Sequence, residues 1–169
     1  MMRYFAYGSN MLAQRLRAPD RTPSAKFLTA ARLKGHVLKF HKRSRDGSGK
    51  CSAFETGNPN DEVHGIVFEI GETEKPALDK AEGLGKGYGE KVVHLTTSHQ
   101  NLSAFTYIAT ADYIDNSLRP YTWYKDLVVA GAKQHSLPRR YIRQLEAVET
   151  QEDPDSERAS RERRILQHV

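Results

Sequence analysis

The chain has 169 residues, of which 38% are hydrophobic and 28% charged, and this size favours one folded domain with a proper apolar core. The net charge is +5, but the basic residues are mostly spread out and glutamates interrupt the arginines of the tail, so we expect no nucleic-acid partner. No apolar run approaches the roughly 20 residues of a membrane span and no signal peptide is apparent, so we expect no membrane association and a cytoplasmic location.

The pattern of apolar residues and turn formers predicts strands in the first two thirds of the chain and helices after them. The expected strands lie at residues 3–7, 30–40 with a break at Gly35, 51–55, 63–70, 91–97 and 104–109. A helix is expected directly after the turn at residues 8–10, with Ser9 or Asn10 capping it through a side-chain oxygen. Further helices are expected at residues 72–81, after Pro120 and at residues 138–148.

Strands followed by helices indicate an α+β domain, a small and strongly curved β-sheet or barrel with flanking helices. We assign this domain to residues 1–149. Residues 150–169 are charged and nearly free of apolar side chains, so we treat them as a C-terminal tail that is either mobile or helical.

Two places along the chain are candidates for chemistry. The turn at residues 7–10 joins a strand to a helix, and such turns leave backbone N–H groups free to bind an anion. Glu82 ends a predicted helix just before a stretch with four glycines, residues 83–89. These glycines fit no nucleotide-binding motif, because a helix and not a strand precedes them, and they suit a close approach to a ligand or a flap. Taken alone, the turn is also explained as an ordinary helix start, and Glu82 as an exposed glutamate at a helix end.

Other chemistries find little support in the sequence. The histidines show no His-Glu-x-x-His spacing, so we expect no metal site. Cys51 is the single cysteine, which excludes an intrachain disulfide and a multi-cysteine zinc site. It also lies outside any nucleophile motif. The serines lack the Gly-x-Ser-x-Gly elbow of hydrolases.

Several motifs in one order resemble the γ-glutamylcyclotransferase family, over roughly residues 4–149. They lie at residues 4–11, 31–33, 61–65, 78–83, 124–126 and 131–133. The resemblance implies a small mixed β-barrel with flanking helices and no cofactor. It also suggests a homodimer, for which the helix from Trp123 to Ala132 could offer an apolar face. That face is equally explained as part of the core.

The resemblance also implies roles for individual residues. The catalytic residue would be Glu82. Tyr88 would close over the ligand and Tyr124 would contact it. The glycine-rich stretch from Gly85 to Gly89 departs from the family pattern and leaves the acceptor preference open. The substrate-binding loop would comprise Tyr4, Phe5, Ala6, Tyr7, Gly8 and Ser9, with Asn10 adjacent.

The implied reaction converts a γ-glutamyl amino acid to 5-oxoproline by attack of its own α-amine on the γ-carbonyl. We expect Glu82 to act as general acid/base from a pocket of low polarity, with Tyr7, Tyr88, Tyr107 and Tyr124 forming the walls. Three alternatives stay open: a cyclotransferase for γ-glutamyl-amines or a biosynthetic intermediate, a member of the fold that only binds its ligand, and a nucleic-acid-binding protein.

Overall fold

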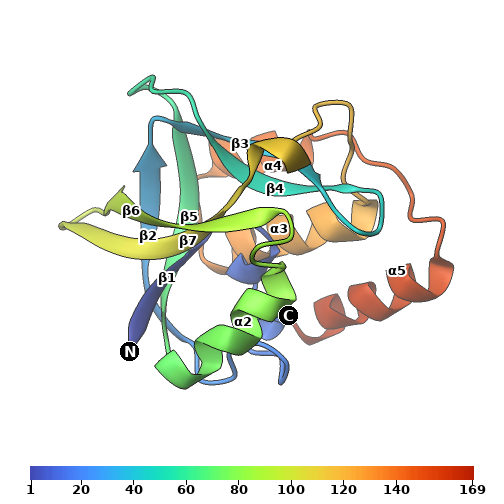
Figure 1. Ribbon diagram of the computed structural model, residues 1–169, viewed down its shortest axis with the longest axis horizontal. Helices are drawn as coiled ribbons and strands as arrows, with labels where there is room; N and C mark the ends of the chain where they lie inside the picture. The colour runs from blue at the N-terminus through green and yellow to red at the C-terminus, as the bar shows by residue number, and fades with distance from the viewer.

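The computed structural model describes residues Met1 to Val169, and five strands close into a barrel in the order β1-β5-β2-β6-β7 (Figure 1). Neighbouring strands are antiparallel, except that β1 and β7 pair in parallel at Tyr4 and Phe105. The expected curved, mixed barrel with flanking helices is therefore confirmed. The barrel strands are β1 (Met2–Ala6), β2 (Lys26–Lys34), β5 (Glu62–Ile70), β6 (Tyr88–Thr96) and β7 (Asn101–Ala109).

A separate two-stranded sheet packs beside the barrel. It consists of β3 (His36–Arg43) and β4 (Gly49–Glu55). Gly35 has a φ of 75°, in the left-handed region that glycine enters without strain, and it turns the chain between β2 and β3. The predicted break at Gly35 is thus confirmed, whereas the predicted strand was too short, because β2 begins at Lys26 and β3 continues to Arg43.

The barrel core is built from apolar residues of the strands, and β5, which the sequence pattern predicted from its apolar run, is the clearest case. β5 contributes Val63, Ile66, Val67, Phe68 and Ile70, all of them fully buried. Gly65 lets β5 approach β1, since a Cβ there would lie 2.5 Å from Cε2 of Phe5. This close approach fixes β1, and with it the turn that follows β1.

The helices lie around the barrel (Figure 1). They are α1 (Ala13–Leu16), α2 (Lys75–Glu82), α3 (Thr122–Gln134), α4 (Arg139–Glu146) and α5 (Ser156–Arg163). Three short 3-10 helices connect strands to helices: η1 (Ser9–Met11), η2 (Glu72–Glu74) and η3 (Ala111–Tyr113). A fourth, η4 (Arg164–His168), follows α5. None of the helices is both long enough and apolar enough to span a membrane.

The predicted N-cap at Ser9 or Asn10 was wrong. Neither η1 nor α1 has a side-chain cap, and the backbone N–H of Ala13 donates to Oε1 of Gln134 instead. The Ser9 hydroxyl accepts a hydrogen bond from Arg15, and the Asn10 side chain points toward Glu82. These two polar residues are engaged in longer-range contacts and not in capping the helix.

α3 packs its apolar side into the body of the protein. Trp123, Leu127 and Val128 are buried within the chain itself. Of the two explanations for this face, the structure shows core packing. Gly131 allows α3 to contact η1, because a Cβ there would lie 2.6 Å from the Leu12 nitrogen.

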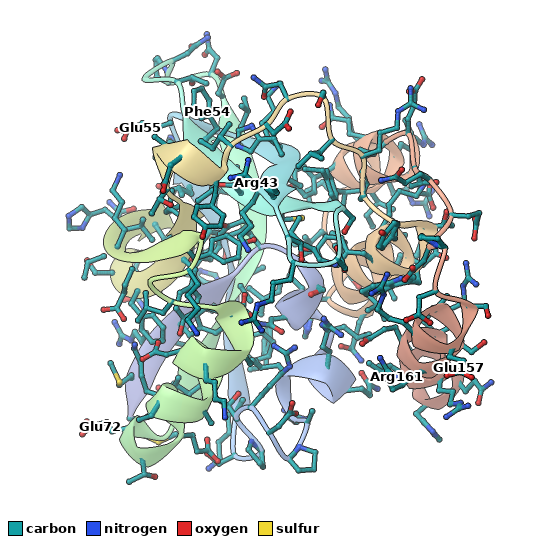
Figure 2. All side chains as sticks on the ribbon, turned by 45° about the vertical axis from the view of Figure 1, so that its right-hand side comes forward. Arg43, Phe54, Glu55, Glu72, Glu157 and Arg161 are labelled. Atoms are coloured by element: carbon teal, nitrogen blue, oxygen red, sulfur yellow. The ribbon has the colours of Figure 1, made fainter.

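The charged tail forms α5 and η4 at the edge of the molecule (Figure 1). Asp153 anchors it: its carboxylate is buried, accepts a 2.9 Å hydrogen bond from Nε1 of Trp123 and pairs with Arg158 at 2.5 Å. Glu157 and Arg161, labelled in Figure 2, are exposed on α5. Of the two states considered for the tail, the structure shows the helical one.

Candidate active site

A small cavity lies where the turn after β1 meets the end of α2, under side chains from β4, β6, β7 and α3. Its volume is about 30 Å³, which leaves room for a water molecule but not for a larger ligand. It brings together most of the residues singled out in the sequence. The lining residues are Tyr4, Tyr7, Gly8, Ser9, Asn10, Cys51, Glu82, Tyr88, Thr106, Tyr107 and Tyr124.

Phe5 and Ala6, also predicted for the binding loop, do not line this cavity. The Phe5 side chain is buried in the barrel, and its carbonyl accepts a 2.7 Å hydrogen bond from the Thr106 hydroxyl. Ala6 continues the β1 ladder opposite Ile66. Both residues hold the strand from which the turn projects.

Glu82 is the last residue of α2, which ends there because Gly83 adopts the left-handed conformation, with φ of 74°. Its side chain is 19% exposed, and Oε1 accepts hydrogen bonds from Nδ2 of Asn10 at 2.6 Å and from Arg21 at 3.1 Å. The expected pocket of low polarity around Glu82 is therefore wrong. A guanidinium and an amide bind the carboxylate directly.

Asn10 links Glu82 to the aromatic wall. Its Nδ2 also donates to the Tyr4 hydroxyl at 3.1 Å, and its Oδ1 faces Arg21 at 3.4 Å. Asn10 is buried and follows the turn directly, so the turn and the carboxylate are fixed relative to each other. This network sets the orientation of the carboxylate toward the cavity.

Gly8 allows the turn to sit close to the cavity wall. A Cβ at this position would lie 3.1 Å from Cβ of Cys51 and 3.3 Å from the Tyr124 hydroxyl. The backbone N–H of Gly8 makes no hydrogen bond within the protein. This donor is therefore free for an anionic or carbonyl oxygen, which is the chemistry expected of the turn.

Tyrosine hydroxyls surround the cavity and are held by defined partners. Tyr7 donates to the carbonyl of Tyr107, and Tyr88 donates to the carbonyl of Cys51. The Tyr124 hydroxyl accepts a 3.1 Å hydrogen bond from the Cys51 backbone N–H. Burial raises the pKa of Tyr88 and of Tyr124, so that these hydroxyls stay protonated and neutral at physiological pH.

Cys51, in the same wall, is a buried thiol between Gly8 and Tyr124. Burial raises its pKa to about 12. It therefore stays protonated and is no nucleophile at neutral pH, in agreement with the absence of a nucleophile motif.

Sequence reasoning missed Arg21, Thr106 and the position of Cys51 in the cavity wall. Arg21 follows a polar turn that carries no motif, and no local pattern connects it with Glu82, 61 residues further along the chain. Thr106 and Tyr107 are neighbours on β7, and Tyr107 was expected as a wall residue. The alternation of a strand would not have predicted that both line the cavity.

A larger groove lies elsewhere on the surface, between α4 and strands β2 and β3. Its volume is about 1000 Å³, and it is lined by residues such as Arg32, Leu38, Arg140 and Tyr141. It contains neither Glu82 nor the turn. The convergence of a carboxylate, a free N–H donor and neutral hydroxyls makes the smaller cavity the candidate for chemistry.

Comparisons with known proteins show which proteins this chain is similar to. A model of the AIG2-like family matches residues 62–145. A protein named γ-glutamylcyclotransferase from Bos taurus is 34% identical over 151 residues, 86% of this chain and 78% of that protein. Its namesake from Homo sapiens is 34% identical over 153 residues, again 86% and 78% of the two chains. A solved structure described as a γ-glutamyl cyclotransferase matches with a TM-score of 0.84 and 30% identity over 98% of both chains.

Proposed function

Because the chain belongs to the γ-glutamylcyclotransferase family, we propose that it cyclises the γ-glutamyl group of a γ-glutamyl amino acid to 5-oxoproline, with Glu82 as general acid/base. The observation that carries this proposal is the position of the Glu82 carboxylate. It borders the cavity that Gly8 also lines, and it accepts a hydrogen bond from Asn10.

In this reaction the α-amine nitrogen forms a bond to the γ-carbonyl carbon, and the bond from that carbon to the acceptor nitrogen breaks. A proton leaves the α-amine and reaches the departing amine, so the atoms balance without a cofactor. Nucleophile and electrophile belong to one molecule, and holding them in attack geometry is worth on the order of 7–11 kcal/mol. Much of the catalysis is therefore positioning.

Glu82 supplies the proton transfer. Arg21 and Asn10 bind its ionised form, which is the form that accepts a proton from the substrate ammonium. The protonated carboxyl then returns the proton to the departing amine. A positioned general acid/base typically contributes about 10²–10⁴-fold to the rate.

The turn and the tyrosines bind the substrate in this proposal. The Gly8 N–H is available to a substrate carboxylate or to the oxyanion that develops on the γ-carbonyl. Tyr88 and Tyr124 present neutral rings and hydroxyls, which suit an uncharged γ-amide. Since the ligand-free cavity has a volume of only about 30 Å³, its walls must move when substrate binds.

Replacement of Glu82 by glutamine tests the proposal. Glu82→Gln keeps the shape and the hydrogen bond with Asn10 but cannot transfer the proton, so release of 5-oxoproline should fall by about 10²-fold or more while folding is kept. Glu72→Gln, at an exposed glutamate labelled in Figure 2, is the matched control and should retain full activity. Substantial turnover by Glu82→Gln would refute the assignment, and so would absence of 5-oxoproline from every γ-glutamyl substrate offered to the wild type.

A cytoplasmic location and a homodimer remain predictions. Since the apolar face of α3 is buried within the chain, a dimer would have to use another surface. Light scattering on the purified protein measures the oligomeric state directly.

A further inference from the structure

The C-terminal tail reaches the candidate site through Arg15 of α1. Nη1 of Arg15 pairs with Oε2 of Glu162 on α5 at 2.8 Å, and its Nε donates to the Ser9 hydroxyl at 2.9 Å. Ser9 lines the cavity that Glu82 borders. Arg15 therefore connects a residue 147 positions further along the chain to the turn of the candidate site.

The three side chains of this network are shielded from water. Those of Arg15 and Glu162 are 13% and 22% exposed, and Ser9 is buried. Fully exposed ion pairs contribute little, because water and salt screen them and both side chains are mobile. A shielded pair is screened less, and a guanidinium bound at two of its nitrogens is fixed in direction as well as in position.

The tail is held to the body of the protein without the help of Glu162. The Asp153 carboxylate, just before α5, accepts a 2.9 Å hydrogen bond from Nε1 of Trp123, and Ala159 within α5 is buried. Attachment of the tail therefore does not explain why the Glu162 carboxylate lies against Arg15.

The Ser9 hydroxyl is the free end of the network. A serine hydroxyl has one proton to donate and two lone pairs to accept with. Arg15 occupies a lone pair of Ser9, and no group of the protein accepts the Ser9 proton. A hydrogen bond from a charged donor also polarises the hydroxyl that accepts it, so that this hydroxyl becomes a better donor itself.

We propose that Glu162 and Arg15 are positioning residues for Ser9. Glu162 holds the Arg15 guanidinium, and Arg15 holds the Ser9 hydroxyl so that its proton is donated to an oxygen of the γ-glutamyl substrate. The C-terminal tail then contributes to the active site although none of its residues lines the cavity. This inference rests on the proposed function and assigns the tail a part in it.

Two substitutions that interrupt the network at different points test the inference in the full-length chain. The assay is release of 5-oxoproline from γ-glutamyl-alanine. Arg15→Met removes the donor to Ser9 and should lower kcat/KM by about 10- to 100-fold, the worth of one charge-assisted hydrogen bond. Glu162→Gln removes only the charge that holds Arg15 and should lower kcat/KM by about 3- to 10-fold. Arg15→Lys should recover part of the loss, because it keeps the charge without the second nitrogen.

The same substitutions in a Ser9→Ala background separate positioning of Ser9 from a structural role. With the hydroxyl absent, Arg15→Met and Glu162→Gln should each lower kcat/KM by less than about twofold further. An ion pair that only stabilises the fold would cost the same factor in both backgrounds, and that result would overturn the inference. Because Asp153 fastens the tail independently, Glu162→Gln is expected to fold even where Arg15→Met does not.

Glu157→Gln is the matched control, since it removes a negative charge from an exposed position of the same helix (Figure 2) and should leave kcat/KM unchanged. Urea denaturation of each variant shows that it is folded. An unchanged kcat/KM in Glu162→Gln, or an equal loss in Glu157→Gln, overturns the inference while the proposed function stands. Absence of 5-oxoproline from the wild type itself would refute both.

Discussion

Gly131 connects the packing of α3 to the geometry of the candidate site, and Gly131→Ala is therefore the most informative change outside the site. The glycine is buried where α3 crosses η1, the short helix that contains Ser9 and Asn10. A Cβ there would lie 2.6 Å from the nitrogen of Leu12 and 2.7 Å from Cβ of Met11. The first of these atoms is backbone and cannot rotate away.

The contact distances around Gly131 give the expected size of the losses in stability and in kcat. Ordinary contacts begin at 3.4 Å, so relief of the 2.6 Å contact requires α3 and η1 to separate by about 0.8 Å. Overpacking of this kind costs about 1–3 kcal/mol, and the better helix propensity of alanine returns about 1 kcal/mol. We expect a net loss of up to about 2 kcal/mol in the free energy of unfolding. Since a displacement near 1 Å at a reacting centre can cost about 10²-fold, kcat should fall by about 10- to 100-fold.

Urea denaturation measures the stability, and release of 5-oxoproline from a γ-glutamyl amino acid measures the activity. Gly89→Ala is the control, because a Cβ there would first meet Thr110 at an ordinary 3.6 Å. It should change neither quantity appreciably. If Gly131→Ala keeps wild-type stability and kcat, the close crossing does not position the turn and this reasoning is refuted.

Three further predictions concern individual groups. Arg21→Met removes the guanidinium that holds the Glu82 carboxylate, so kcat for release of 5-oxoproline should fall by about 10-fold or more while folding is kept; an unchanged kcat would show that the pair does not orient Glu82. Arg158, together with Trp123, holds the pKa of the Asp153 carboxyl well below its usual range, so the contribution of this group is complete above about pH 4 and is lost as the pH falls further. Asp153→Asn should accordingly lower the free energy of unfolding by about 2 kcal/mol at pH 7 and by clearly less at pH 2, as urea denaturation at both values would reveal. Cys51, whose pKa burial raises to about 12, should resist alkylation by iodoacetamide at pH 8 until urea unfolds the chain; rapid labelling of the native protein would contradict its placement in the cavity wall.

The strands and helices were predictable because their signals are local. The apolar run of β5 and the change to helical spacing after Pro120 each specify their element within a few residues. The ends of strands were harder to predict. β6 begins at Tyr88 and β7 at Asn101, each three residues before the predicted start, because the ladder between them continues through polar and glycine positions that carry no strand signal.

The site was predictable only in part, for a similar reason. Glu82 and the turn belong to contiguous motifs, so a single sequence is enough to find them. Arg21 lies in a polar part of the sequence without a motif, and only the tertiary fold brings it to Glu82. The prediction of low polarity around Glu82 was wrong, because no sequence pattern indicates which side chain will pair with a carboxylate.

The ion pair between Arg21 and Glu82 changes the account of how one carboxylate acts first as a base and then as an acid. Arg21, whose Nη1 lies 3.1 Å from Oε1 of Glu82, holds the carboxylate in place to accept a proton from the substrate ammonium. Return of that proton must then be driven by the substrate, since the departing amine becomes strongly basic as its bond to the γ-carbon breaks. In this arrangement the protein prepares the first proton transfer and the chemistry of the leaving group drives the second.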